Sequence, residues 1–131
     1  MATFTQFEEM MSWKEARILN QKIGALLNEE RFGKNFRLIA QIEGSAGSIM
    51  DNIAEGFERG GNREFIQFLY IAKGSCGELR SQMYRALDRK YINETEFNMI
   101  LTDLQKISGL LQKLISYLET TTLKGIKHKN K

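Results

Sequence analysis

Apolar residues recur at alternating intervals of three and four along much of the chain, and this spacing restricts the fold more than any other feature. One series comprises Phe97, Ile100, Leu104, Ile107, Leu111, Leu114 and Leu118. An earlier series with the same spacing comprises Phe65, Leu69, Ala72, Cys76, Leu79, Met83 and Ala86. Residues three and four apart lie on one side of an α-helix, so each series predicts a helix with an apolar face. Leu101, Leu110 and Ile115 widen the later stripe beyond that of a two-stranded coiled coil, which favours a bundle.

Two further apolar series precede these. The first comprises Trp13, Ala16, Leu19, Ile23 and Leu26, and the second Leu38, Ile42, Ala46, Ile49, Ile53 and Phe57. The chain has no proline to interrupt them. Breaks are expected at Gly33, at 60–61 and at 91–93. Four amphipathic helices joined by short turns predict an all-α, antiparallel up-down-up-down four-helix bundle over residues 1–123.

Polar residues indicate where some of these helices begin. Thr5 with Glu8, and Asn93 with Glu96, have the spacing of capping pairs. Asn62 is a candidate N-cap after two glycines.

Small residues gather at 44–48 in the second predicted helix and at 74–77 in the third. Gly44 and Gly47 each lower helix stability by about 1 kcal/mol relative to alanine. Two explanations are open: the two helices approach each other closely through these residues, or the second helix is locally broken.

The chain is poorly equipped for catalysis. It has one cysteine and one histidine, Cys76 and His128, which excludes an internal disulfide and an ordinary zinc or di-iron site within one chain. Cys76 falls in an apolar series, so we expect a buried core residue and not a nucleophile. We therefore predict no enzymatic activity, no cofactor, no metal and no small-molecule substrate.

Positive charge is concentrated at the C-terminus. The net charge is +3, and residues 124–131 contain no acid but four lysines: Lys124, Lys127, Lys129 and Lys131. The other 15 basic and 16 acidic residues nearly balance. We interpret 124–131 as a flexible basic tail that either aids solubility or contacts phosphate. The sequence shows no signal-peptide pattern and no long apolar stretch, so we expect a cytoplasmic protein without a membrane span.

The third predicted helix becomes basic towards its end, through Arg80, Arg85, Arg89 and Lys90. Such residues stabilise the negative end of a helix dipole, which is one sufficient explanation. The alternative is that they and the tail lysines bind nucleic acid.

A polar group lies near the corner between the second and third predicted helices. It comprises Ser48, Asn52, Glu55, Gly56 and Ser75. Because buried polar groups need hydrogen-bond partners, we expect a structural lock between the two helices. A polar binding site in the bundle is the alternative.

Several motifs resemble one family. They are SIMDNIAEG at 48–56, Arg59, Glu64-Phe65, Phe68-Leu69 and IAKGSCGEL at 71–79, with WKEA at 13–16 and Leu38 with Gln41. Together these are similar to the bacterial proteins encoded by intervening sequences of 23S ribosomal RNA genes, and to their free-standing relatives.

The resemblance implies a left-handed four-helix bundle that forms a homo-oligomer, often a pentamer. Relatives include accessory proteins of diversity-generating retroelements, which bind nucleic acid. The chain departs from the family pattern in two ways: Glu43-Gly44 replace a usual basic pair, and Met50 replaces a proline. Our hypothesis is an oligomeric bundle that binds structured RNA or a ribonucleoprotein partner. The alternative is a protein-interaction scaffold with no nucleic-acid role.

Overall fold

The computed structural model describes residues 4–129 of the 131-residue chain, with side chains described for residues 4–122. Four long helices form its framework: α1 (Met11–Leu27), α2 (Phe36–Glu58), α3 (Asn62–Asp88) and α4 (Glu94–Lys129). Two 3-10 turns, η1 (Phe7–Glu9) and η2 (Glu30–Phe32), flank α1. No strand occurs over residues 4–129, and no helix in that range is long and apolar enough to cross a membrane.

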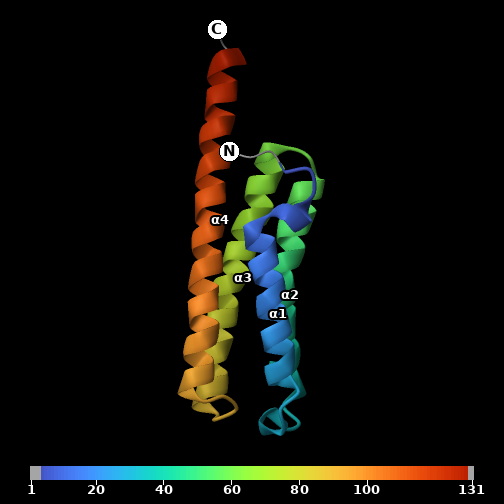
Figure 1. Ribbon diagram of the computed structural model, residues 1–131, viewed down its shortest axis with the longest axis vertical. Coiled ribbons are helices and arrows are strands. Elements are labelled where there is room, and N and C mark those ends of the chain that lie inside the picture. The colour runs from blue at the N-terminus through green and yellow to red at the C-terminus, as the bar shows by residue number, and fades with distance from the viewer. Residues whose placement is uncertain (1–3, 130–131) are drawn as a thin grey trace.

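The helices run alternately up and down, as Figure 1 shows, and α4 extends beyond the end of the other three. Each helix packs on the next one in the chain, and α1 also packs on α4, which closes the bundle. The most extensive contact joins α2 and α3. The predicted four-helix bundle is therefore confirmed. The separation of a tail at residue 124 stays a prediction, because the side chains beyond residue 122 lie outside the described ones.

The core consists of the predicted apolar series, with one correction. Nearly every member of the four series is buried, and Trp13, Phe57 and Phe65 lie partly buried at the edges. In α4, however, Ile115 is fully buried whereas Leu114 is only partly buried. The prediction placed Leu114 in the core. A straight α-helix drifts by about 20° per heptad relative to a seven-residue repeat, so the core position moves by one residue along a long helix.

The helix ends agree only in part with the predicted caps. Asn93 and Glu96 form the expected reciprocal pair, since each side chain accepts a hydrogen bond from the other's backbone N–H, at 2.8 and 2.9 Å. The Thr5–Glu8 prediction is wrong, because Thr5 precedes η1 and donates to Glu9, and the capping box there joins Gln6 and Glu9. The N-cap of α3 is Gly61, and Asn62 is already helical.

One glycine makes the close approach of α2 and α3 possible. A Cβ added at Gly56 would lie 2.6 Å from the Cβ of Phe68 and 3.0 Å from Cδ1 of Phe65. A Cβ is fixed to the backbone and cannot rotate away, so only a residue without a side chain fits here. Gly56 thereby brings the C-terminal part of α2 directly against α3.

Within the two groups of small residues, α2 and α3 meet through Ser48 and Ser75 and not through the glycines. Helix α2 is continuous through Gly44 and Gly47, so there is no local break. A Cβ at Gly44, Gly74 or Gly77 would meet no atom within 4 Å, and one at Gly47 would touch only Asp51 of its own helix. The prediction that these four glycines bring the two helices together is therefore wrong within the single chain. Ser45 and Ala46, which lie between Gly44 and Gly47 on α2, are nevertheless buried.

A salt bridge ties the turn after α1 to the beginning of α4. Arg31 donates from both terminal nitrogens to the two carboxylate oxygens of Glu96, at 2.7 and 2.9 Å. These hydrogen bonds from Arg31, helped by the backbone N–H of Asn93, hold the pKa of the Glu96 carboxyl below its ordinary value. The same carboxylate therefore caps α4 and fastens it to the α1–α2 connection.

The glycine geometry predicts opposite effects for two alanine substitutions. Gly56→Ala should destabilise the protein by about 1–3 kcal/mol, because its methyl group overlaps α3. Gly44→Ala, which adds a methyl group in open space, should stabilise it by about 0.5–1 kcal/mol through better helix propensity. Urea unfolding followed by circular dichroism measures both. Equal effects of the two variants would contradict the close approach at Gly56.

The Arg31–Glu96 pair predicts a pH dependence of stability. Since the carboxyl pKa is lowered on folding, the stabilisation is complete above the ordinary glutamate pKa and is lost as pH falls through the lowered value. Glu96→Gln should therefore lower the melting temperature at pH 7, and this effect should shrink progressively as the pH falls below the ordinary glutamate pKa. Thermal melts at a series of pH values measure this. The control is Glu43→Gln, at an exposed carboxylate, for which we expect the difference in melting temperature from the natural protein not to change with pH in this way.

Candidate nucleic-acid interface

The basic residues that the sequence groups together on α3 face different neighbours. Arg80 lies on the side of α3 that faces α4, where it borders a groove. Arg85 lies over α2, and its guanidinium donates to Oε1 of Gln41 at 2.9 Å. A five-residue separation turns a helical side chain by about 140°, which explains the divergence. These two arginines therefore do not form one stripe.

The last two basic residues of this group lie at the end of α3. Arg89 is the C-cap, and Lys90 follows with a left-handed backbone, φ 64°. Both are exposed, as are Arg80 and Arg85. Positive charge at this end of a helix is favourable to its dipole, so part of the pattern has a local structural cause.

The tail lysines contribute nothing to the described geometry. The backbone of α4 continues to Lys129, but the side chains of Lys124, Lys127 and Lys129 and the whole of Lys131 lie outside the described residues. Their role in binding stays a prediction.

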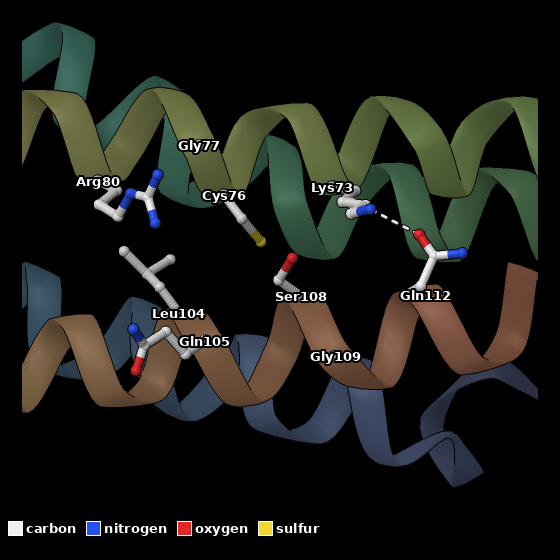
Figure 2. Close-up of a pocket in the computed structure, with 9 residues that line it drawn as sticks. All are labelled: Lys73, Cys76, Gly77, Arg80, Leu104, Gln105, Ser108, Gly109 and Gln112. Atoms are coloured by element: carbon white, nitrogen blue, oxygen red, sulfur yellow. Dashed lines mark hydrogen bonds between the residues drawn. The ribbon is translucent and has the colours of Figure 1, made fainter.

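A groove runs between α3 and α4 at mid-height of the bundle (Figure 2). Its volume is about 420 Å³, and it is lined by Lys73, Cys76, Gly77, Arg80, Leu104, Gln105, Ser108, Gly109 and Gln112. The ammonium of Lys73 donates to Oε1 of Gln112 at 2.6 Å across the groove. Burial raises the pKa of the Cys76 thiol to about 12, so this side chain is uncharged at neutral pH. The charged groups among the nine lining residues are therefore both positive.

The polar corner forms a hydrogen-bonded bridge between α2 and α3. Ser75 donates from Oγ to Oγ of Ser48 at 2.8 Å, and it also lies 3.1 Å from the carbonyl oxygen of Ile71. Asn52 donates from Nδ2 to the carbonyl oxygen of Ser48 at 2.8 Å and to its Oγ at 2.9 Å. Three of the five residues are thus brought together, in an arrangement that gives their partly buried polar atoms hydrogen-bond partners.

The other two residues of the predicted corner act separately. Glu55 is half exposed and forms an ion pair with Arg59, one turn along α2, at 2.7 Å. Gly56 supplies the contact with Phe65 and Phe68 described above. Neither residue has a described hydrogen bond to the serine bridge.

Sequence reasoning missed the continuation of this bridge. One turn away, Ser45 donates to Oε1 of Glu78 at 2.6 Å. Ser45 lies three residues before Ser48, and Glu78 lies three residues after Ser75. Because antiparallel helices run in opposite directions, the Ser48–Ser75 pair predicts that Ser45 and Glu78 also face each other. Further along α3, Gln82 is 7% exposed and its Oε1 accepts no hydrogen bond from the described residues. Among the described residues, no cluster of three or more potential metal ligands occurs.

Comparisons with known proteins agree with this architecture. The sequence model of a family described as 23S rRNA-intervening sequence protein matches residues 8–113. A crystal structure is also similar, that of a protein of unknown function from the S23 ribosomal protein family of Bacteroides thetaiotaomicron. The two chains are 24% identical, with a TM-score of 0.74 over 80% of this chain and 98% of the other, which is a likeness of fold. No curated protein sequence matches the chain.

The serine bridge predicts a specific loss of stability. Ser75→Ala removes the donor to Ser48 and leaves a partly buried hydroxyl with one partner fewer, so it should destabilise the protein by about 1–2 kcal/mol. Ser81→Ala, on the exposed side of the same helix, should change stability by less than about 0.5 kcal/mol. Thermal and urea unfolding compare the two. A similar small effect of both substitutions would show that the bridge does not hold the helices together.

Proposed function

Because the chain belongs to the 23S rRNA-intervening sequence protein family, we propose that it is a non-enzymatic, oligomeric bundle that binds structured RNA or a ribonucleoprotein partner. The RNA part of this proposal rests on the basic residues of α3 and of its C-terminal end, which form no salt bridge with the described side chains. The four salt bridges of the described side chains use Lys22, Arg31, Arg59 and Lys106. Arg80, Arg85, Arg89 and Lys90 take part in none of them, so their charge is available to phosphate.

Assembly into an oligomer would strengthen weak contacts of this kind. Eight large apolar side chains are at least 40% exposed in the isolated chain: Met11, Ile18, Phe36, Tyr70, Ile71, Tyr84, Met99 and Tyr117. These residues are spread over all four helices, and covering those on one side with a second copy would remove apolar surface from water, which favours self-association. In a pentamer the four tail lysines of each chain would become twenty on one particle, and multivalent attachment would raise the avidity.

The absence of enzymatic activity is proposed on the chemistry of the residues present. The single cysteine is 4% exposed, with the raised thiol pKa already described, so it has little nucleophilic thiolate at neutral pH. The single histidine, His128, lies in the part of α4 whose side chains are not described. A cytoplasmic location is part of the same proposal, since the family's name refers to ribosomal RNA.

A protein-interaction scaffold without a nucleic-acid role is the second candidate. The balanced charge of residues 1–123 favours it. So does Glu43, an exposed acid next to Gly44, where the family pattern has a basic pair. The exposed apolar side chains would serve such a partner equally well.

RNA binding should be measurable and strongly dependent on salt. With purified protein and fragments of 23S ribosomal RNA, we expect retention at about 50 mM salt that weakens steeply by about 200 mM, because each phosphate contact releases counterions. Fluorescence anisotropy measures the affinity, and light scattering gives the particle mass relative to the 15.1 kDa chain. No retention even at low salt would overturn the RNA proposal, and a particle of one chain's mass would overturn the oligomer.

Deletion of residues 124–131 separates the two candidate functions. RNA binding predicts a loss of at least about tenfold in affinity and a shallower salt dependence, because four lysines per chain are removed. The scaffold predicts unchanged binding of a protein partner. The shortened chain keeps the whole described core, so its melting temperature serves as the control for folding.

A further inference from the structure

Two glycines leave an opening in the groove between α3 and α4. A Cβ added at Gly77 or at Gly109 would meet no atom within 4 Å. Each lies inside a long helix, where glycine is less stable than alanine by about 1 kcal/mol. Gly56 has an internal packing reason for its lack of a side chain, but these two have none within the described chain. What they provide is room for a ligand to approach the helix backbones.

The walls of this opening favour an anion. Lys73 and Arg80 are its two charged residues, and no carboxylate is among the nine that line it. Neither cation takes part in a salt bridge of the described side chains, and the partner of Lys73 is the neutral amide of Gln112. Ser108 adds a hydroxyl and Gln105 a second amide. In Figure 2 Lys73, Cys76 and Arg80 of α3 point towards α4 and Ser108 and Gln112 of α4 point towards α3, whereas Gln105 lies across α4 at the edge of this space.

The spacing of the cations favours an extended anion over a single small ion. Lys73 and Arg80 are seven residues apart on one helix, a rise of about 10 Å. The groove between them is bordered by hydrogen-bond donors, and a strand would replace the hydrogen bond that joins Lys73 to Gln112 across one end of it. A chain of regularly spaced phosphates can contact both cations at once, whereas one phosphate ion would engage fewer of these groups.

We propose that the groove between α3 and α4 binds the phosphate backbone of a nucleic-acid strand, with Lys73 and Arg80 as its cationic contacts and Gly77 and Gly109 leaving room for the strand. The inference rests on the proposed RNA-binding function and gives it a site. That site includes Lys73, Ser108 and Gly109, none of which the charge pattern of the sequence indicates.

Charge removal in the groove gives the first test. The double variant Lys73→Gln/Arg80→Gln should lower the affinity for single-stranded RNA at least about tenfold. It should also make the slope of log affinity against log salt shallower by about 1.4, because two phosphate contacts are lost. The matched control is Lys34→Gln/Arg37→Gln, which removes one exposed lysine and one exposed arginine near the start of α2. We expect it to change the affinity less than about threefold.

Filling the groove without changing the charge gives the second test. Gly109→Gln places a long neutral side chain in the opening, and its Cβ meets nothing in the chain, so the protein should fold and still lose affinity. Gly44→Gln is the matched control, since Gly44 is an equally open helical glycine on α2 and lies outside the groove. Circular dichroism checks that both variants keep their helices.

Four results would overturn the proposal. If the groove variants lose no more RNA affinity than their controls while the natural protein binds RNA, the site is wrong and the proposed function stands. If the natural protein binds no RNA, the proposed function itself fails. If adenosine monophosphate or inorganic phosphate binds and is lost in Lys73→Gln/Arg80→Gln while RNA affinity is unchanged, the groove takes small phosphates and not a strand. Light scattering on Gly109→Gln must also give the natural mass, because a changed mass would make the groove an interface between copies.

Discussion

The direct packing of α2 on α3 is the contact on which the rest of the structure depends. Gly56 allows the backbones to approach until Phe65 and Phe68 lie against α2, and the bridge between Ser48 and Ser75 sets the same two helices in register. Apolar stripes alone tolerate sliding, since leucine and isoleucine contacts are not directional. The contact at Gly56 and the hydrogen bond between Ser48 and Ser75 each require one relative position of the two helices, so together they prevent sliding. The position of α3 then determines what α4 can pack against.

The surface chemistry follows from this arrangement. Once α3 is fixed on α2, basic residues that follow each other on α3 are divided between the side that faces α2 and the side that faces α4. Arg85 is directed towards α2 and meets Gln41, whereas Arg80 and Lys73 face α4 and border an opening with no acid. Elsewhere in the described chain, two lysines are paired with carboxylates across helices, Lys22 with Asp103 and Lys106 with Glu15. The bundle thus neutralises charge at some helix contacts and leaves it unpaired at others.

Glycine has two distinct roles in this protein, and the difference bears on function. At Gly56 the lack of a side chain serves the fold, because α3 occupies the space of a Cβ. At Gly77 and Gly109 the same lack leaves open space at the surface of a groove. A propensity argument treats all helical glycines alike, as destabilising by a similar amount. The atoms around each glycine distinguish the two roles: packing requires a glycine at position 56, whereas the glycines at 77 and 109 leave space that a partner could occupy.

The fold could be predicted from the sequence because helical periodicity is a local property: residues three or four apart share a face whatever the rest of the chain does. The four apolar series, the turns between them and the Asn93–Glu96 cap needed no knowledge of neighbours. The place of Leu114 and Ile115, the contact at Gly56 and the pair of Ser45 with Glu78 did need it. These depend on how far one helix is rotated and shifted against another, which is set by packing between residues distant in the chain. For the same reason, the sequence by itself determined a bundle of amphipathic helices with few catalytic groups, and only the tertiary structure decided which cations border a common groove.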